Sequence, residues 1–155
     1  MNAYLLVKTL HILSSTILFG LGAGSAYYAL RAWRSGNTQV IASTFKHLVF
    51  ADWVFTTTTA ILQPLSGLAL MHLAGWSLGM AWIQWSIGLY VFAGVCWLPV
   101  VWLQIKVHKM ASLALEAGTP MPMKSHQYMR WWFALGWPAF LSFIIIFYLM
   151  VAKPM

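Results

Sequence analysis

Acidic residues are almost absent from this chain of 155 residues, which contains only Asp52 and Glu116 against nine Lys and Arg. The single cysteine, Cys96, excludes a disulfide within the chain and any Cys-x-x-Cys metal or redox motif. Charged residues make up 7% of the sequence and hydrophobic residues 61%, a balance that one soluble core of this size does not bury. We therefore expect an integral membrane protein.

Catalytic signature motifs are missing as well. The sequence contains no Gly-x-Ser-x-Gly, His-Glu-x-x-His or P-loop pattern, and no apolar run carries a pair of carboxylates for proton-coupled transport. Nor do the basic residues form a run of the kind that binds phosphates, so nucleic acid is not an expected partner. The expected partner is the lipid bilayer.

Four apolar runs are long enough to cross the hydrocarbon core of a bilayer, which takes about 20 residues in a helix. Backbone polar groups in lipid must be satisfied within the segment, so each run is expected to be helical. The first is expected to be a retained helix, because no small-residue cleavage site ends a short apolar stretch. The sequence thus predicts one all-α domain, residues 1–155, a four-helix membrane bundle with helices at roughly Tyr4–Leu30, Leu48–Leu73, Leu78–Leu103 and Tyr128–Ala152.

The distribution of positive charge predicts the orientation of the bundle. Lys and Arg are retained in the cytoplasm, and only Lys8 and Lys153 fall at the end that carries the termini. We therefore expect both termini on the periplasmic side of a bacterial inner membrane. The basic residues at the opposite end are Arg31, Arg34, Lys46, Lys106, Lys109, Lys124 and Arg130.

Polar residues recur at helical spacing and predict the inward faces of the four helices. The stripes are Tyr4, Lys8, His11, Ser15, Gly22 and Ser25; Asp52, Thr56, Thr59, Gln63, Ser66 and Gly67; Ser86, Tyr90, Trp97 and Gln104; and His126, Arg130, Trp137 and Tyr148. At the cytoplasmic end, His47, Asp52, His126 and Arg130 are expected to form one patch. Arg130 pairing with Asp52 is its structural interpretation, and proton relay or binding of an acidic substrate its functional one.

His11 is the histidine expected at the greatest depth in the membrane. An ionisable group there is costly, so it suggests a functional site. Neutral imidazole is a common ligand of haem iron, and a four-helix bundle has room for a porphyrin between its helices. The alternative is a structural histidine that forms a hydrogen bond with Ser14, Ser15 or Gln63. We name His11 as the metal ligand of a possible b-type haem.

Three further residues are candidates for contacts with that cofactor. Lys8, one turn from His11, can hold a haem propionate or extend to the outer interface. His72 is a possible second axial ligand, although it projects away from the Asp52–Gln63 stripe and an exposed interfacial position is the alternative. Gln63 lies on the same inward stripe as Asp52 and completes the candidate site.

Several segments resemble an uncharacterised bacterial family of predicted integral membrane proteins, domain of unknown function 2269. They include Tyr4-Leu5-Leu6-Val7-Lys8-Thr9-Leu10-His11, Ala51-Asp52-Trp53-Val54-Phe55-Thr56, Gln63-Pro64-Leu65-Ser66-Gly67 and Trp132-Phe133-Ala134-Leu135-Gly136-Trp137-Pro138. The resemblance spans the whole chain. It implies a membrane protein and no particular activity.

Lys8-x-x-His11 near the start of the first helix is also similar to HemJ-type protoporphyrinogen oxidases and to copper-resistance membrane domains. This resemblance implies that His11 takes part in haem binding. The predicted function is accordingly a haem-b protein with an electron-transfer or oxidoreductase role. The alternatives are a cofactor-free accessory or scaffold subunit that binds a membrane-protein partner through Gly20 and Gly24, and a small-solute or metal transporter that works as an oligomer.

Overall fold

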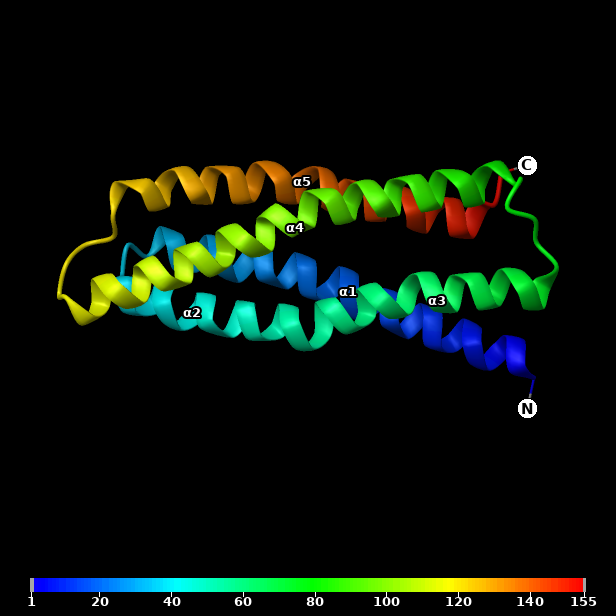
Figure 1. The fold of residues 1–155 in the computed structure, drawn as a ribbon, viewed down its shortest axis with the longest axis horizontal. Helices are drawn as coiled ribbons and strands as arrows, with labels where there is room; N and C mark the ends of the chain where they lie inside the picture. Colours follow the sequence, from blue (N-terminus) through cyan, green and yellow to red (C-terminus); the bar gives the residue numbers. More distant parts are fainter. Residues whose placement is uncertain (1, 155) are drawn as a thin grey trace.

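The protein is a bundle of four long helical rods, here described by a computed structural model over residues 2–154 (Figure 1). Within those residues there is no strand, and four helices are long and apolar enough to cross a membrane. The second rod is continuous through three elements. In chain order the elements are α1 (Ala3–Arg34), α2 (Thr38–Ala51), the π-helical turn η1 (Asp52–Thr56), α3 (Thr57–Ala74), α4 (Ala81–Glu116) and α5 (Met123–Ala152).

Both ends of the chain lie at the same end of the bundle (Figure 1). We call this the terminal end; it also holds the turn between α3 and α4. We call the opposite end the basic end, because it carries seven of the nine Lys and Arg side chains: Arg31, Arg34, Lys46, Lys106, Lys109, Lys124 and Arg130. The expected fold class, an all-α membrane bundle with its termini together, is confirmed.

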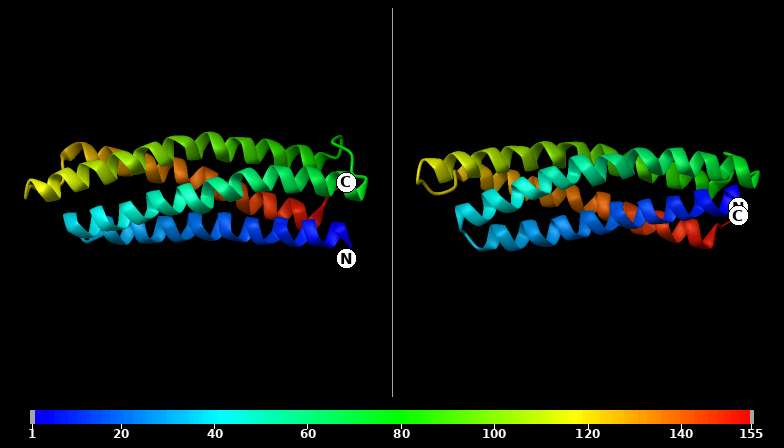
Figure 2. Two further views of the ribbon diagram at one scale, coloured as in Figure 1. Left: turned by 60° about the horizontal axis from the view of Figure 1, so that its bottom comes forward. Right: turned by 90° about the horizontal axis from the view of Figure 1, so that it is seen from below.

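The rods associate in two pairs that α2 joins. α1 lies along α3 and α2, whereas α4 lies along α5 and α2 (Figure 2). Asn2 and Asn37 begin α1 and α2 by accepting hydrogen bonds from backbone N–H groups of the first turn, so these helix starts are capped by side chains. Gly75, with φ of 69°, ends α3 in the left-handed conformation that favours glycine.

The helices extend further at the basic end than the apolar runs predicted. The predicted starts at Leu48 and Tyr128 and the predicted end at Leu103 are wrong as helix limits, because the rods begin at Thr38 and Met123 and α4 runs to Glu116. Polar side chains do not break a helix, and the turn residues that do are Gly36 and Gly118, both at positive φ. The apolar runs thus marked the lipid-spanning part of longer helices.

The best-packed core of the bundle lies toward the basic end. At about 1.5 Å per residue, α4 is about 54 Å long, well beyond the roughly 30 Å hydrocarbon core, so the rods continue into water. Phe45 and Val107 are fully buried there. The cluster comprises Ala29, Ile41, Ala42, Phe45, Leu48, Val100, Leu103, Val107, Ala111, Met129 and Trp132. Apolar burial stabilises this end, as in a soluble protein.

The inward face predicted for the last helix is wrong. His126, Arg130, Trp137 and Tyr148 are all exposed. The buried residues of α5 are instead Ser125, Met129, Trp132 and Ser142. Lipid is as apolar as the bundle interior, so bulky aromatic residues are as stable facing the bilayer as facing a helix. Small residues and those with interhelical partners mark the true interface of α5.

Candidate functional site

His11 is bound to α3 through its imidazole. Its Nδ1 lies 2.7 Å from Oγ of Ser66, and the ring is half-buried between α1 and α3. A Cβ on Gly67 would lie 3.5 Å from Cε1 of His11, so the absence of a side chain at Gly67 lets the ring lie close to the α3 backbone. The partners expected from the sequence were Ser14, Ser15 and Gln63. The ring is instead bonded by Ser66.

Gln63 reinforces the same contact without touching the imidazole. Its Nε2 donates to the backbone carbonyl of His11 at 2.9 Å and to Oγ of Ser14 at 2.5 Å. Gln63 and Ser14 are both buried. The extra bond to a helix carbonyl and the bond to Ser14 tie α1 to α3 at the residue that carries the imidazole. Gln63 therefore fixes the position of His11 in the membrane.

The hydrogen bonds indicate which nitrogen of His11 carries the proton. The Ser66 hydroxyl has one hydrogen, and its Oγ lies 2.6 Å from the carbonyl of Leu62, to which it donates. We infer that Ser66 accepts from Nδ1–H of His11, so the neutral ring exposes the lone pair of Nε2. No hydrogen bond to Nε2 occurs within residues 2–154. This is the state in which imidazole binds a metal.

The other two residues predicted at the cofactor lie at the surface of the bundle. Lys8 is exposed, and its Nζ lies 5.7 Å from the centre of the Tyr4 ring. His72 is exposed in the last turn of α3. The structure therefore brings His11 and Gln63 into one cluster, with Ser14 and Ser66, and leaves Lys8 and His72 outside its hydrogen bonds.

A second polar cluster surrounds Asp52, near the basic end. Oδ1 of Asp52 accepts from the hydroxyl of Thr56 at 2.8 Å, and Oδ2 accepts from Nε2 of Gln104 at 2.8 Å. Nε1 of Trp132 donates to Oε1 of Gln104 at 3.3 Å. All four residues are buried. One chain of hydrogen bonds thus connects the second, third and fourth rods.

The backbone around Asp52 is wound as a π-helix. The N–H of Thr57 bonds the carbonyl of Asp52, and the Thr57 hydroxyl reaches the same carbonyl at 3.0 Å. A π-turn widens the helix locally and is frequent at functional sites. Here it leaves Asp52 and Thr56 on the inner face while Trp53 remains exposed. The periodicity predicted the stripe Asp52–Thr56–Thr59–Gln63, and those four side chains are buried.

The predicted patch of two histidines, Asp52 and Arg130 does not form around the carboxylate. Arg130, His47 and His126 are exposed, whereas both oxygens of Asp52 accept from uncharged groups within residues 2–154. His126 lies edge-on to Trp33, with ring centroids 5.0 Å apart. The prediction that Arg130 pairs with Asp52 is wrong because Gln104 occupies that position. A guanidinium also retains more hydration at the exposed surface than beside a buried carboxylate.

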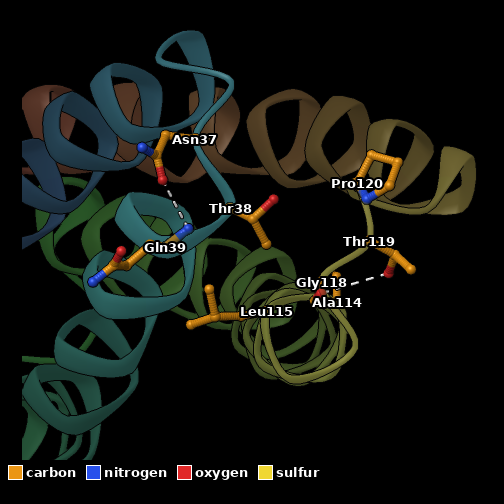
Figure 3. A pocket seen from close by; sticks show the side chains of 8 residues that line it. All are labelled: Asn37, Thr38, Gln39, Ala114, Leu115, Gly118, Thr119 and Pro120. Atoms are coloured by element: carbon orange, nitrogen blue, oxygen red, sulfur yellow. Dashed lines mark hydrogen bonds between the residues drawn. The ribbon is translucent and has the colours of Figure 1, made fainter.

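A polar hollow of about 400 Å³ lies at the tip of the basic end, between the start of α2 and the end of α4 (Figure 3). Asn37 faces Gln39 there because its side chain caps α2. Thr119 lies at the turn toward α5, near Pro120. The polar atoms of this hollow serve helix ends, so we assign it a structural role.

Within residues 2–154, no group of three or more His, Cys, Asp or Glu side chains is arranged to hold a metal ion. A group that brings its own donor atoms, such as a porphyrin, needs only one or two ligands from the protein. His11 has a ring nitrogen bonded to a neighbouring helix, through Oγ of Ser66.

Four long apolar helices with polar clusters in their interior define a polytopic integral membrane protein. The chain belongs to the family described as predicted integral membrane protein (DUF2269), whose model matches residues 5–154. Neither curated proteins nor solved structures give a match to the chain. The expected family is confirmed; the similarity to HemJ-type and copper-resistance proteins stays a prediction.

Proposed function

We propose that this protein binds haem b in the bacterial inner membrane and has an electron-transfer or oxidoreductase role. The observation that carries the proposal is the state of His11. Its ring is held on Nδ1 by Ser66 while Nε2 has no hydrogen-bond partner within residues 2–154. A hydrogen bond that fixes one imidazole nitrogen is typical of histidines that bind metals through the other.

The residues around His11 fit the proposed group. Ser66 and Gly67 set the rotation of the imidazole, and Gln63 holds the backbone of α1 in place. Lys8 lies one helical turn toward the terminal end, where its ammonium is suited to a propionate. When bound, the haem would supply one-electron chemistry. The protein's own residues orient the ligand nitrogen.

The proposed orientation follows from the basic end. Lys and Arg are retained in the cytoplasm, so we propose that the basic end faces the cytoplasm and that His11 lies near the periplasmic surface. A redox centre at that depth is suited to exchange with a periplasmic carrier or with a lipophilic substrate in the outer leaflet. His72, at the same end, is the proposed second ligand.

A reduced-minus-oxidised spectrum tests the proposal. Protein purified in detergent from haem-replete cells is expected to show the α-band of a b-type haem. His72→Ala is expected to change the position or intensity of that band while retaining it, because one axial ligand would remain. A stable, monodisperse protein without an α-band would contradict the proposal.

A cofactor-free scaffold is the second candidate, favoured by the packing of α1. A Cβ added at Gly20 or at Gly24 would meet nothing within 4 Å, so this face is not used between the helices of the monomer. Small residues at this spacing let a helix of another protein approach closely. In the same purification, a colourless bundle that elutes with a stoichiometric membrane partner would support this candidate.

A further inference from the structure

An apolar hollow of about 310 Å³ opens on the side of the bundle between η1 and α4. Its volume lies at the lower end of the usual range for small-molecule sites, about 300–1,000 Å³. It lies far along the rods from His11 and is independent of the haem proposal. The lining residues are Asp52, Trp53, Thr57, Trp97, Leu98, Val101, Trp102 and Ile105.

The hollow faces lipid rather than water. Leu98 and Trp53, which line it, are 64% and 62% exposed, and the charged side chains closest to them in the sequence are Asp52, Lys46 and Lys106. Asp52 follows Lys46 by six positions, which is about 9 Å along a helix. Lys46 and Lys106 flank the hollow on the side of the basic end, so the hollow lies at the margin of the hydrocarbon.

Among the described residues that line the hollow, Asp52 alone has an acidic or basic side chain, and the ammonium of Lys106 lies at the ring of Trp102. The oxygens of Asp52 accept from Thr56 and from Gln104, which are uncharged, and a carboxylate has room for further donors. When ionised, it has no ion pair with a Lys, Arg or His side chain within residues 2–154. In a membrane, such a charge is costly, and an ionic partner lowers that cost.

The walls of the hollow suit the same kind of partner. Trp53, Trp97 and Trp102 line the hollow together with Asp52. Tryptophan attracts cations through its ring, as the ammonium of Lys106 already shows at 5.4 Å from the centre of the Trp102 ring. Apolar surface, aromatic rings and one negative charge together fit an organic cation with a hydrophobic body. They do not fit an anion or a sugar.

We propose that the hollow at Asp52 binds lipophilic organic cations that enter from the bilayer. The positive centre of the ligand lies against the carboxylate of Asp52, and its apolar body lies on Trp97 and Leu98. Gln104 positions the carboxylate from α4 and Thr56 positions it from the π-turn. The widened backbone at η1 is thereby given a function, since it carries Asp52 at the lining of the hollow.

Binding of tetraphenylphosphonium to the full chain in phosphatidylcholine nanodiscs tests this site. Tetraphenylborate has the same shape and the opposite charge, so it controls for hydrophobic partition. We expect saturable binding of the phosphonium and none of the borate, although the chain carries a formal charge of +7. Asp52→Asn is expected to weaken phosphonium binding about tenfold or more.

A second variant keeps the test valid if Asp52→Asn does not fold. Leu98→Trp fills the hollow from its rim and leaves the hydrogen bonds of Asp52 intact, so it is expected to abolish binding. Leu68→Trp, on an exposed position of α3 outside the hollow, is the matched control and is expected to bind normally. Wild-type affinity in Leu98→Trp would overturn the proposal.

Two further outcomes would also overturn it. Equal binding of the phosphonium and the borate would show an apolar groove without charge recognition. Loss of phosphonium binding when phosphatidylethanolamine replaces phosphatidylcholine would show that a lipid headgroup is the natural occupant. Unchanged binding in that lipid supports a free lipophilic cation.

Discussion

Gln104→Leu is expected to destabilise the bundle by about 2–4 kcal/mol. Gln104 is 1% exposed and serves two partners, donating to Asp52 and accepting from Trp132. Leucine has nearly the same volume, so the packing is retained while both partners lose their hydrogen bond. The carboxylate oxygen and the indole N–H are then left unpaired in a region that excludes water, which is the costly outcome.

Unfolding in mixed micelles with increasing sodium dodecyl sulfate measures this free energy. Gln84→Leu is the matched control, because Gln84 is exposed on the same helix and makes no side-chain hydrogen bond within residues 2–154. The double variant Gln104→Leu with Asp52→Leu is expected to recover part of the lost stability, since it also removes the carboxylate that Gln104→Leu leaves unpaired. Equal stability of the Gln104 and Gln84 variants would contradict the assigned network.

Phe45→Ala is expected to cost about 3–5 kcal/mol, the usual loss for a phenylalanine in a packed core. Phe45 has no exposed surface and is part of the cluster toward the basic end. Its removal leaves a cavity among helices α1, α2 and α4, which hold their positions through the surrounding contacts. The missing ring forfeits both dispersion contacts and apolar burial.

The same unfolding assay separates this effect from a general effect of losing a phenyl group. Phe50, on the same helix, is 64% exposed and faces lipid. In Phe50→Ala, lipid fills the space that the ring occupied, so no cavity remains. The expected loss of unfolding free energy is therefore below about 1 kcal/mol. If both variants lost the same stability, the core would not be concentrated toward the basic end.

The membrane architecture was predictable because its cause is composition. Runs of about 20 apolar residues leave no other solvent than lipid, and lipid leaves no other backbone than helix. The stripe from Asp52 to Gln63 was predictable for a related reason, since polar groups in hydrocarbon must face partners. These inferences need only the identity and spacing of residues.

The partners within the site were not predictable to the same degree. Ser66, rather than Ser14, Ser15 or Gln63, bonds the imidazole, and this choice depends on how α1 and α3 are rotated about each other. Asp52 bonds Gln104 rather than Arg130, because α5 is rotated so that Arg130 is exposed, and the sequence does not fix that rotation. Hydrophobicity did not distinguish the lipid-facing side of α5 from its inner side, since both sides are apolar.

The central claim is that His11 offers Nε2 as a ligand within the membrane. Titration of the purified, haem-free protein with haemin tests it most directly, with His47→Ala as control because His47 is exposed near the basic end. Wild type and His47→Ala are expected to bind one equivalent with the spectrum of a nitrogen-ligated haem, and His11→Ala is expected to lose it. Identical titrations of wild type and His11→Ala would contradict the claim.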